Sequence, residues 1–384
     1  MQYRQLGQTK IEASILGFGC MRFPTLKNPD PQSDVGNINE PEAINMLRFG
    51  IDNGINYIDT AYPYHGGKSE VVVGKALLDG YREQVTLVSK LPTWAIETHA
   101  DFDRILNEQL TKLQTKSLDL YLVHALNAGT WKKMQDLNVF DFLRRAVDDG
   151  RIQHVGFSFH DKLEVFKDIV DAYPWEVVQI QLNYLDEDYQ AGIDGMNYAA
   201  AKDMAIIVME PLRGGRLTNN LPTGVHEIFN TVSTIKTPAE WAFRWVYNHP
   251  AVAVVLSGMS TIEQVKENIT IAESGLPNSL TPEETSCIEA VKDYFKRRLK
   301  INCTDCKYCL PCPHGVRIPQ VFSIYNDASM WDSLPAARKH YERMISKSGD
   351  ASLCVECGNC EALCPQNLTI IEYLKEAHVA LNEA

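Results

Sequence analysis

Residues 85–124 read VTLVSKLPTWAIETHADFDRILNEQLTKLQTKSLDLYLVH, in which two short apolar runs flank a stretch of helical periodicity. Both runs have the length of β-strands, and their near-continuous apolar character is typical of parallel strands buried on both faces. The same alternation of strand and helix recurs along most of the chain. It yields eight strand candidates: Ile15–Cys20, Ile55–Thr60, Val85–Leu91, Leu118–His124, Ile152–Ser158, Val177–Asn183, Ala205–Pro211 and Val252–Gly258.

This alternation is compatible with two α/β folds, an open doubly wound sheet and a closed (β/α)8 barrel. Eight units over roughly 270 residues favour the barrel. An open dinucleotide-binding sheet would carry a GxGxxG fingerprint after its first strand, whereas Gly17–Arg22 reads GFGCMR. We therefore predict a (β/α)8 TIM barrel, preceded by a short β-hairpin at Tyr3–Ser14.

The composition is that of a globular protein with a large core, because 45% of the 384 residues are hydrophobic and 22% are charged. A formal net charge of −12 argues against a nucleic-acid partner, since a phosphate backbone requires a basic surface. The opening residues MQYRQLGQTK do not resemble a signal peptide, and no apolar run has the length of a membrane span. We expect a cytoplasmic protein with no membrane partner.

Cysteine is the most informative residue type. Eight of the ten cysteines lie beyond position 300, in two runs that both end in Cys-Pro. Three thiolates at two-residue spacing wrap one four-iron four-sulfur cluster, and the Cys before Pro reaches the other cluster. We assign one cluster to Cys303, Cys306, Cys309 and Cys364 and the other to Cys354, Cys357, Cys360 and Cys312. A pair of zinc sites with four thiolates each is the alternative.

The positions of these runs predict the domain organisation. Residues 1–280 form the barrel, a connecting helix spans 281–300, and residues 301–384 form a small, mainly helical ferredoxin-type domain. Helical patterns at Gln320–Asp327 and Leu368–Leu381 separate and follow the cysteine runs. The long gap between the runs resembles the helical ferredoxin modules of dehydrogenase iron-sulfur subunits.

Four ionisable side chains stand where three consecutive strands end: Asp59, Tyr64, Lys90 and His124. In a barrel of this kind the strand ends carry the chemistry, so the four side chains are expected to meet at one mouth. Any one of them alone is more often a hydrogen-bonded structural residue than a catalyst. As a set they are difficult to explain by packing, because ionisable groups near a core need partners.

With the opening LGFGCMR, the spacing of these four residues resembles the aldo/keto reductase family over about residues 1–275. The resemblance implies a catalytic tetrad that passes a hydride from a nicotinamide to a carbonyl, with Tyr64 as proton donor. Lys90 would lower the pKa of this phenol and Asp59 would hold Lys90 in place, while His124 would hydrogen-bond the carbonyl oxygen. Tyr62 is the rival phenol, but the resemblance implies Tyr64, because the family uses a five-residue offset from the acid that corresponds to Asp59.

The resemblance also implies a binding site for the dinucleotide. Ser158 and Gln179 would contact the nicotinamide carboxamide, Arg213 or Arg216 would offset the pyrophosphate charge, and later residues would contact adenine. The full predicted cofactor-binding set is Gly19, Met21, Ser158, Gln179, Met209, Leu212, Gly214, Ser257, Gly258, Glu267 and Asn268.

Several positions depart from the family pattern. Gly258 and Gln264 stand where basic residues usually bind a ribose 2′-phosphate, so NAD(H) is favoured over NADP(H), with Lys266 as a substitute cation. Phe159 replaces a common Asn, and Met209 replaces an aromatic ring.

Three functions fit these features. The first is a nicotinamide-linked reductase of a small carbonyl compound, or dehydrogenase of the alcohol, whose clusters are structural or exchange electrons with a partner protein. The second is a ferredoxin-type electron carrier with the barrel as a docking module, and the third is a nucleotide-sensing protein. The complete tetrad favours the first. Residues 26–39 and 126–136 are expected to be substrate loops, with Arg22 and Trp94 as candidate pocket residues.

Overall fold

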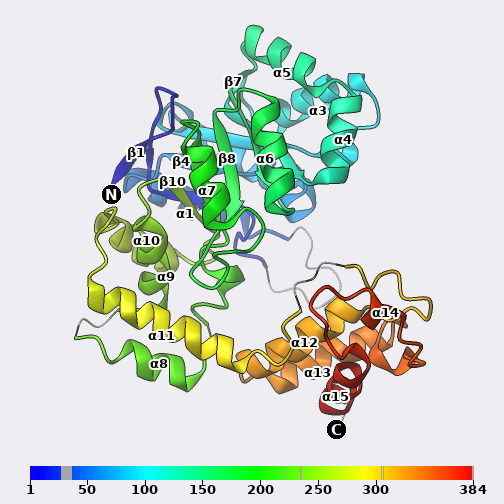
Figure 1. Ribbon diagram of the computed structural model, residues 1–384. Coiled ribbons are helices and arrows are strands. Elements are labelled where there is room, and N and C mark those ends of the chain that lie inside the picture. Colours follow the sequence, from blue (N-terminus) through cyan, green and yellow to red (C-terminus); the bar gives the residue numbers. More distant parts are fainter. Residues whose placement is uncertain (27–36, 220, 234–235, 304, 306, 383–384) are drawn as a thin grey trace. The chain divides into compact units, whose positions relative to one another are not determined.

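The computed structural model describes residues 1–26, 37–219, 221–233, 236–303, 305 and 307–382. Its main unit is a closed barrel of eight parallel strands, which confirms the predicted fold (Figure 1). In chain order these strands are β3 (Leu16–Gly19), β4 (Tyr57–Asp59), β5 (Thr86–Leu91), β6 (Leu118–Leu126), β7 (Ile152–Phe159), β8 (Val177–Gln181), β9 (Ala205–Met209) and β10 (Val252–Ser257). Strand β10 pairs with β3 and closes the barrel.

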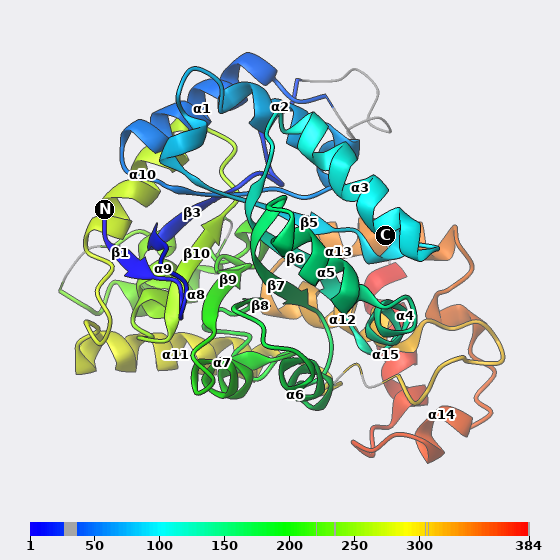
Figure 2. The same cartoon turned by 90° about the horizontal axis from the view of Figure 1, so that it is seen from above.

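Helices surround these strands, as Figure 2 shows from above. Their apolar faces pack on strands that are buried on both sides, and every residue of β5 is buried. The helices of the barrel unit are α1 (Glu40–Asp52), α2 (Ser69–Ala76), α3 (His99–Lys112), α4 (Ala128–Asp136), α5 (Val139–Asp148), α6 (Leu163–Ala172), α7 (Gly192–Ala200), α9 (Pro238–Tyr247) and α10 (Ile262–Glu273). Short 3₁₀ turns are η1 (Tyr64–Gly67), η2 (Arg82–Gln84), η3 (Thr93–Ala95) and η4 (Arg213–Gly215).

The predicted hairpin is confirmed as the antiparallel pair β1 (Tyr3–Gln5) and β2 (Glu12–Ser14). Its side chains Leu6 and Ala13 join a buried cluster with the starts of the barrel strands. Gly7 has a φ of +51°, and a Cβ there would lie 2.6 Å from the Asp203 carbonyl oxygen. The hairpin thus closes the end of the barrel opposite the mouth, and the turn at Gly7 requires glycine.

One predicted loop is a helix instead. Residues 128–136 form α4, whose N-terminus is capped by Asn127: the side-chain oxygen accepts hydrogen bonds from the backbone N–H groups of Gly129 and Thr130. This cap satisfies two otherwise unpaired donors and starts a helix in a segment without a strong apolar pattern. Most of the other predicted loop, residues 27–36, lies outside the described residues.

The second unit comprises residues 219–235 and 282–384. Its longest helix, α11 (Pro282–Arg298), occupies most of the predicted connecting helix. Helix α8 (Thr223–Phe229) packs on α11, and a Cβ on Gly224 would lie 2.5 Å from the Tyr294 ring. Residues inserted between β9 and α9 therefore belong with the C-terminal unit.

The rest of this unit is mainly helical, as predicted. Helices α12 (Ile318–Met330), α13 (Leu334–Ile345) and α15 (Ile370–Asn382) pack on one another around a buried apolar cluster. The short elements η5 (Ala351–Leu353) and α14 (Asn359–Ala362) lie between them in the sequence. In the part of the chain that the structure describes, no helix is long and apolar enough to cross a membrane.

Candidate functional site

The ends of β4 and β5 bring a buried ion pair to the mouth of the barrel. The Lys90 ammonium donates to Asp59 Oδ1 at 2.6 Å, to the Thr60 carbonyl oxygen at 3.0 Å and to the Tyr64 hydroxyl at 3.3 Å. Lys90 is fully buried and Asp59 is 2% exposed. Asp59 pairs in register with Val88, which lies two residues before Lys90 on the adjacent parallel strand, so Lys90 follows on the same face of β5 just beyond Asp59.

The pKa values of this pair follow from burial and mutual attraction. Burial alone would lower the pKa of Lys90, but Asp59 and Tyr64 raise it above its ordinary value. Burial raises the pKa of Asp59, and the Lys90 ammonium opposes that rise. The 2.6 Å contact and the three acceptors around the ammonium favour the ionised pair.

Tyr64 opens the turn η1 and points its hydroxyl at Lys90. Burial raises the pKa of Tyr64 above its ordinary value, and the Lys90 ammonium works against that rise without cancelling it. The predicted net lowering is therefore wrong, although the influence of Lys90 has the predicted sign. The reason is desolvation: a phenolate is disfavoured where the phenol is screened from water.

His124 completes the predicted set at the end of β6. Its ring meets the Tyr64 ring edge-on, with 6.2 Å between the centroids. Burial, and after it the Lys90 ammonium, lower the pKa of His124 well below its ordinary value, so the imidazole is neutral. Its Nδ1 has no hydrogen-bond partner among the described residues. Trp94 lies beside the same imidazole, with 5.2 Å between centroids, and is half-exposed.

The two residues predicted to bind the carboxamide are direct neighbours across β7 and β8. Ser158 pairs in register with Gln179. The Ser158 hydroxyl oxygen accepts from the Ala125 backbone N–H at 2.8 Å, and the Gln179 amide N–H lies 3.5 Å from the Met209 sulfur. Gln179 Oε1 is buried without a partner among the described residues. An unpaired buried acceptor matches the N–H donors of a carboxamide, so these residues fit a nicotinamide ring.

Three glycines, Gly19, Gly214 and Gly258, lie close to Arg22 or Ser257 where β3, β9 and β10 end, and are called the glycine cradle below. Gly214 has a φ of +65°, and a Cβ on Gly19 would lie 3.2 Å from the Ser257 carbonyl oxygen. A Cβ on Gly258 would lie 3.0 Å from the side-chain methylenes of Arg22. Bare backbone at these three positions allows close approach of a ligand phosphate. Leu212 starts the turn at Gly214, and Met21 lies exposed beside Arg22.

A cation that was not predicted for the pyrophosphate, Arg22, lies beside this cradle. Arg22 Nη2 lies 3.5 Å from Glu210 Oε1 and close to Gly214. The Arg213 guanidinium instead lies 3.3 Å from Asp186. Arg22 was predicted only as a pocket residue. The signal that could have placed it here is its position immediately after the GFGCM stretch, beyond the end of β3.

The two residues predicted to contact adenine, Glu267 and Asn268, both lie on α10. The buried Asn268 amide donates to the Ser257 hydroxyl at 3.0 Å, whereas Glu267 is exposed. The Lys266 ammonium lies 5.7 Å from the centre of the Phe49 ring on α1. The structure therefore joins Asn268 to the cradle through Ser257 and directs Lys266 toward α1.

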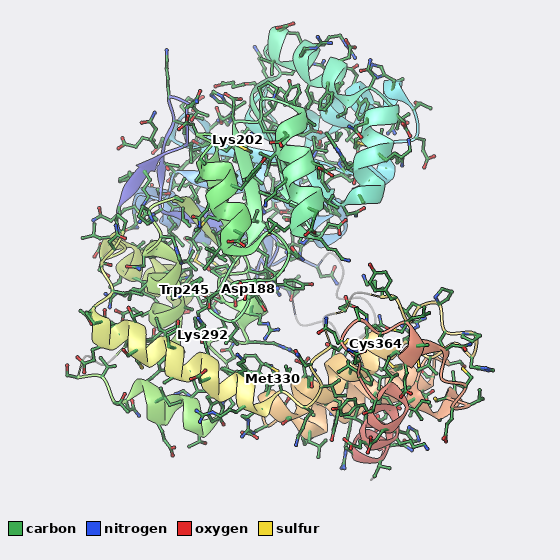
Figure 3. The ribbon with its side chains drawn as sticks, viewed as in Figure 1. Asp188, Lys202, Trp245, Lys292, Met330 and Cys364 are labelled. Carbon is green, nitrogen blue, oxygen red and sulfur yellow. The ribbon has the colours of Figure 1, made fainter. Side chains whose placement is uncertain are left out.

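The C-terminal unit contains two cavities lined by cysteines. Cys309 lines both. The first cavity, of about 220 Å³, is also lined by Cys312, Cys354, Cys357 and Cys360. The second, of about 20 Å³, is also lined by Cys303 and Cys364, the latter visible at the C-terminal unit in Figure 3. Cys306 lies outside the described residues.

The larger cavity has the thiolate lining that an iron-sulfur cluster uses. Within the described ranges, no group of three or more His, Cys, Asp or Glu side chains gathers closely enough to hold a single metal ion. A zinc site gathers four thiolates around one ion, and thiolates distributed around a cavity suit a cubane. The side chains of Leu310, Val355 and Leu363 add an apolar lining to the first cavity.

Comparison with known proteins also divides the chain into a barrel part and a cysteine-rich part. Residues 15–291 match the model described as the aldo/keto reductase family, and residues 302–369 match the model of a 4Fe-4S dicluster domain. The uncharacterized oxidoreductase YqkF of Bacillus subtilis (strain 168) is 26% identical over 76% of this chain and 96% of its own length. L-galactose dehydrogenase of Arabidopsis thaliana is 24% identical over 77% of this chain and 96% of its own length.

Solved structures agree with these relatives. The holo form of aldo-keto reductase AKR11C1 from Bacillus halodurans superimposes with a TM-score of 0.62 at 26% identity, covering 76% of this chain and 96% of that one. The thermostable aldo-keto reductase Tm1743 gives a TM-score of 0.59 at 26% identity, covering 76% of this chain and 99% of that one. Both similarities leave about a quarter of the present chain uncovered.

Proposed function

The chain belongs to the aldo/keto reductase family and carries a 4Fe-4S dicluster domain, and on this basis we propose that it reduces a small aldehyde or ketone, or oxidises the corresponding alcohol. One observation carries the proposal: a buried ammonium, Lys90, contacts both a carboxylate, Asp59, and a phenol, Tyr64, at the barrel mouth. Neither an electron carrier nor a nucleotide sensor needs a proton donor built in this way.

When bound, a nicotinamide dinucleotide supplies the hydride. Tyr64 donates the proton to the substrate oxygen. Because burial raises the pKa of this phenol, Tyr64 remains protonated at neutral pH and is ready to act as an acid. Lys90 stabilises the phenolate that remains after proton donation, and the Asp59 carboxylate keeps the ammonium charged and aimed at Tyr64.

Neutral His124 would orient the substrate. An imidazole without charge can donate one hydrogen bond to a carbonyl oxygen without competing with Lys90 for the phenolate. The half-exposed ring of Trp94 stands beside His124 and would form an apolar wall against the substrate. This arrangement favours a substrate with an apolar group next to its carbonyl.

The dinucleotide would lie from Gln179 and Ser158, at its nicotinamide end, past the glycine cradle to Asn268. Arg22 would offset pyrophosphate charge, because its guanidinium lies close to Gly214 and only its methylenes contact Gly258. The position that is usually basic for a 2′-phosphate is Gly258 itself, and the Lys266 ammonium lies by the Phe49 ring on α1. We therefore favour NAD(H) over NADP(H).

We further propose that the ferredoxin-type domain at residues 301–384, joined to the barrel at 1–280 by a helix at 281–300, holds two 4Fe-4S clusters. The ligand sets would be the two deduced from the cysteine spacing, and the cavities support them: Cys364 lies with Cys303 and Cys309, and Cys312 lies with the second run. Such clusters supply one-electron transfer, so an electron-transfer protein is the partner they imply.

The experiment that tests this function uses anaerobically purified holoprotein and a panel of aldehydes and ketones. We expect oxidation of NADH, followed at its near-ultraviolet absorbance, only when a carbonyl compound is present, with the visible absorbance of the clusters unchanged. Rapid bleaching of the clusters by NADH, without consumption of any carbonyl compound, would instead support an electron-transfer protein.

A further inference from the structure

His65, the residue after the proposed proton donor, forms hydrogen bonds with the backbone of the loop that follows β3. Its Nε2 accepts a hydrogen bond from the Phe23 backbone N–H at 3.1 Å, and the Met21 backbone forms a second hydrogen bond to the ring. The imidazole also stacks on the Phe23 ring, with 5.8 Å between centroids and 25° between planes. A single side chain thus connects the loop after β4 to the loop after β3.

These contacts define the protonation state of the ring. A nitrogen that accepts from an N–H group carries no proton, so the other ring nitrogen must donate to the Met21 carbonyl oxygen. Burial lowers the pKa of His65, while the Met21 carbonyl raises it, and the first effect is larger. The neutral imidazole therefore satisfies one backbone donor and one backbone acceptor at the same time.

The same two chain segments are joined at two points nearer the strands, and a third hydrogen bond braces the second segment internally. The Cys20 backbone N–H donates to the Asp59 carbonyl oxygen at 2.8 Å, and the Ser69 hydroxyl donates to the Cys20 carbonyl oxygen at 2.9 Å. Ser69 also contacts the Thr60 hydroxyl at 2.9 Å. His65 extends this line of hydrogen bonds beyond the strand ends, to the residues on either side of Arg22.

The backbone at His65 is unusual. Its φ is 52°, in the left-handed region that non-glycine residues seldom adopt, and Gly66 follows with a φ of 62°. A non-glycine residue whose backbone is held in this region is strained, and it requires contacts that compensate the strain. The hydrogen bonds to Met21 and Phe23 are such contacts, and the turn that they hold begins with Tyr64.

We propose that His65 is a positioning residue that fixes the Tyr64 phenol relative to the dinucleotide-binding end of β3. The inference rests on the proposed function, because it gives Tyr64 and Met21 the roles assigned above. The proton donor and the hydride donor must be held at a fixed position relative to each other so that both reach one carbonyl group. The residues that hold these two donors lie on different loops. His65 is the side chain that joins these loops beside the phenol.

Two substitutions separate the hydrogen bonds from the ring stack. His65→Phe keeps an aromatic ring on Phe23 but removes both nitrogens. His65→Gln places an amide oxygen as many bonds from Cα as Nε2 and can still accept from the Phe23 N–H. His226→Phe, at an exposed position on α8, is the matched control for the change of residue type. The readouts are kcat, KM, the NADH dissociation constant and hydrogen exchange of the peptide that contains Phe23.

We expect His65→Phe to lower kcat by about 10- to 100-fold, because a misplaced catalytic group has an effect of this size. The NADH dissociation constant should remain close to that of the unsubstituted chain, and the Phe23 amide should exchange faster. His65→Gln should recover most of kcat and of the protection, and His226→Phe should change neither.

A His65→Phe chain with the kcat of the unsubstituted protein would overturn the inference, as would a His65→Gln chain no better than His65→Phe. Failure of the proposed function has a different signature. In that case the unsubstituted chain itself would turn over no carbonyl compound, whereas hydrogen exchange at Phe23 would still report the backbone hydrogen bond.

Discussion

Replacing Tyr64 with Phe is expected to lower kcat for carbonyl reduction by about 10²- to 10⁴-fold, the usual contribution of a positioned general acid. The substitution removes one oxygen atom and keeps the ring that meets His124 edge-on. Lys90 retains its contacts to Asp59 and the Thr60 carbonyl oxygen, so the local structure should persist. Steady-state kinetics together with NADH titration should show lost turnover and nearly unchanged dinucleotide affinity.

Tyr62→Phe is the matched control, because Tyr62 is the rival phenol two residues earlier. Its hydroxyl lies 3.4 Å from Glu108, and its ring lies 4.2 Å from the Lys112 ammonium, so the side chain contacts α3 rather than Lys90. We expect this variant to keep most of its activity. If Tyr62→Phe loses turnover and Tyr64→Phe keeps it, the assignment of the proton donor is wrong.

Lys90→Met is expected to destabilise the barrel by about 3–5 kcal/mol, because removing one member of a buried ion pair leaves an uncompensated buried charge. Asp59 would then carry its charge at 2% exposure without the ammonium. Turnover should be lost as well, since nothing would remain to stabilise the phenolate of Tyr64. Chemical denaturation followed by tryptophan fluorescence is the suitable measurement, since five of the six tryptophans lie in the barrel unit.

The double variant Asp59→Leu/Lys90→Met separates stability from catalysis. Replacing both charges with apolar groups is often neutral for stability, so the double variant should unfold at a higher denaturant concentration than Lys90→Met alone. It should remain inactive. A Lys90→Met chain as stable as the unsubstituted protein would show that Asp59 is not held as a buried carboxylate.

The barrel could be predicted from the sequence because its strands are buried on both faces. Such strands appear as short apolar runs. The predicted first and last residues of all eight strands lie within two residues of the structural bounds. Asp59, Lys90 and His124 were singled out by the same pattern, since a polar residue at the end of an apolar run is expected at the mouth, whereas Tyr64 was chosen over Tyr62 from the family resemblance. Helix α4 was missed because its start depends on a local hydrogen bond, the Asn127 cap, rather than on a periodic apolar face.

Contacts between loops were not readable from the sequence. Arg22 and Gly214 are far apart in the chain and meet only because β3 lies two strands from β9, across β10. The grouping of residues 219–235 with α11 likewise depends on packing, through pairs such as Gly224 and Tyr294. The net rise in the pKa of Tyr64 was missed for a related reason: the sequence shows a cation nearby but does not show how completely the phenol is desolvated.

The predicted cysteine ligand sets rest on a more specific sequence pattern than the predicted cofactor contacts. Two-residue spacing fixes three thiolates around one cubane, so the spacing itself carries the geometry. The proposed dinucleotide site depends on backbone approach at Gly214 and on Gln179, whose side chain is one of many buried amides in proteins. Such residues can be recognised as cofactor contacts only when the fold shows that they lie next to one another.

Direct transfer of hydrogen separates a carbonyl reductase from a protein that passes single electrons. The decisive measurement gives the unsubstituted, anaerobically purified protein NADH with deuterium at the transferable C4 position, in each stereochemical form, and analyses the alcohol product by mass spectrometry and NMR. We expect one of the two forms to place a deuterium on the carbinol carbon of each product molecule. If neither deuterated form of NADH gives an alcohol with deuterium at that carbon, the result would contradict hydride transfer at the Tyr64 site.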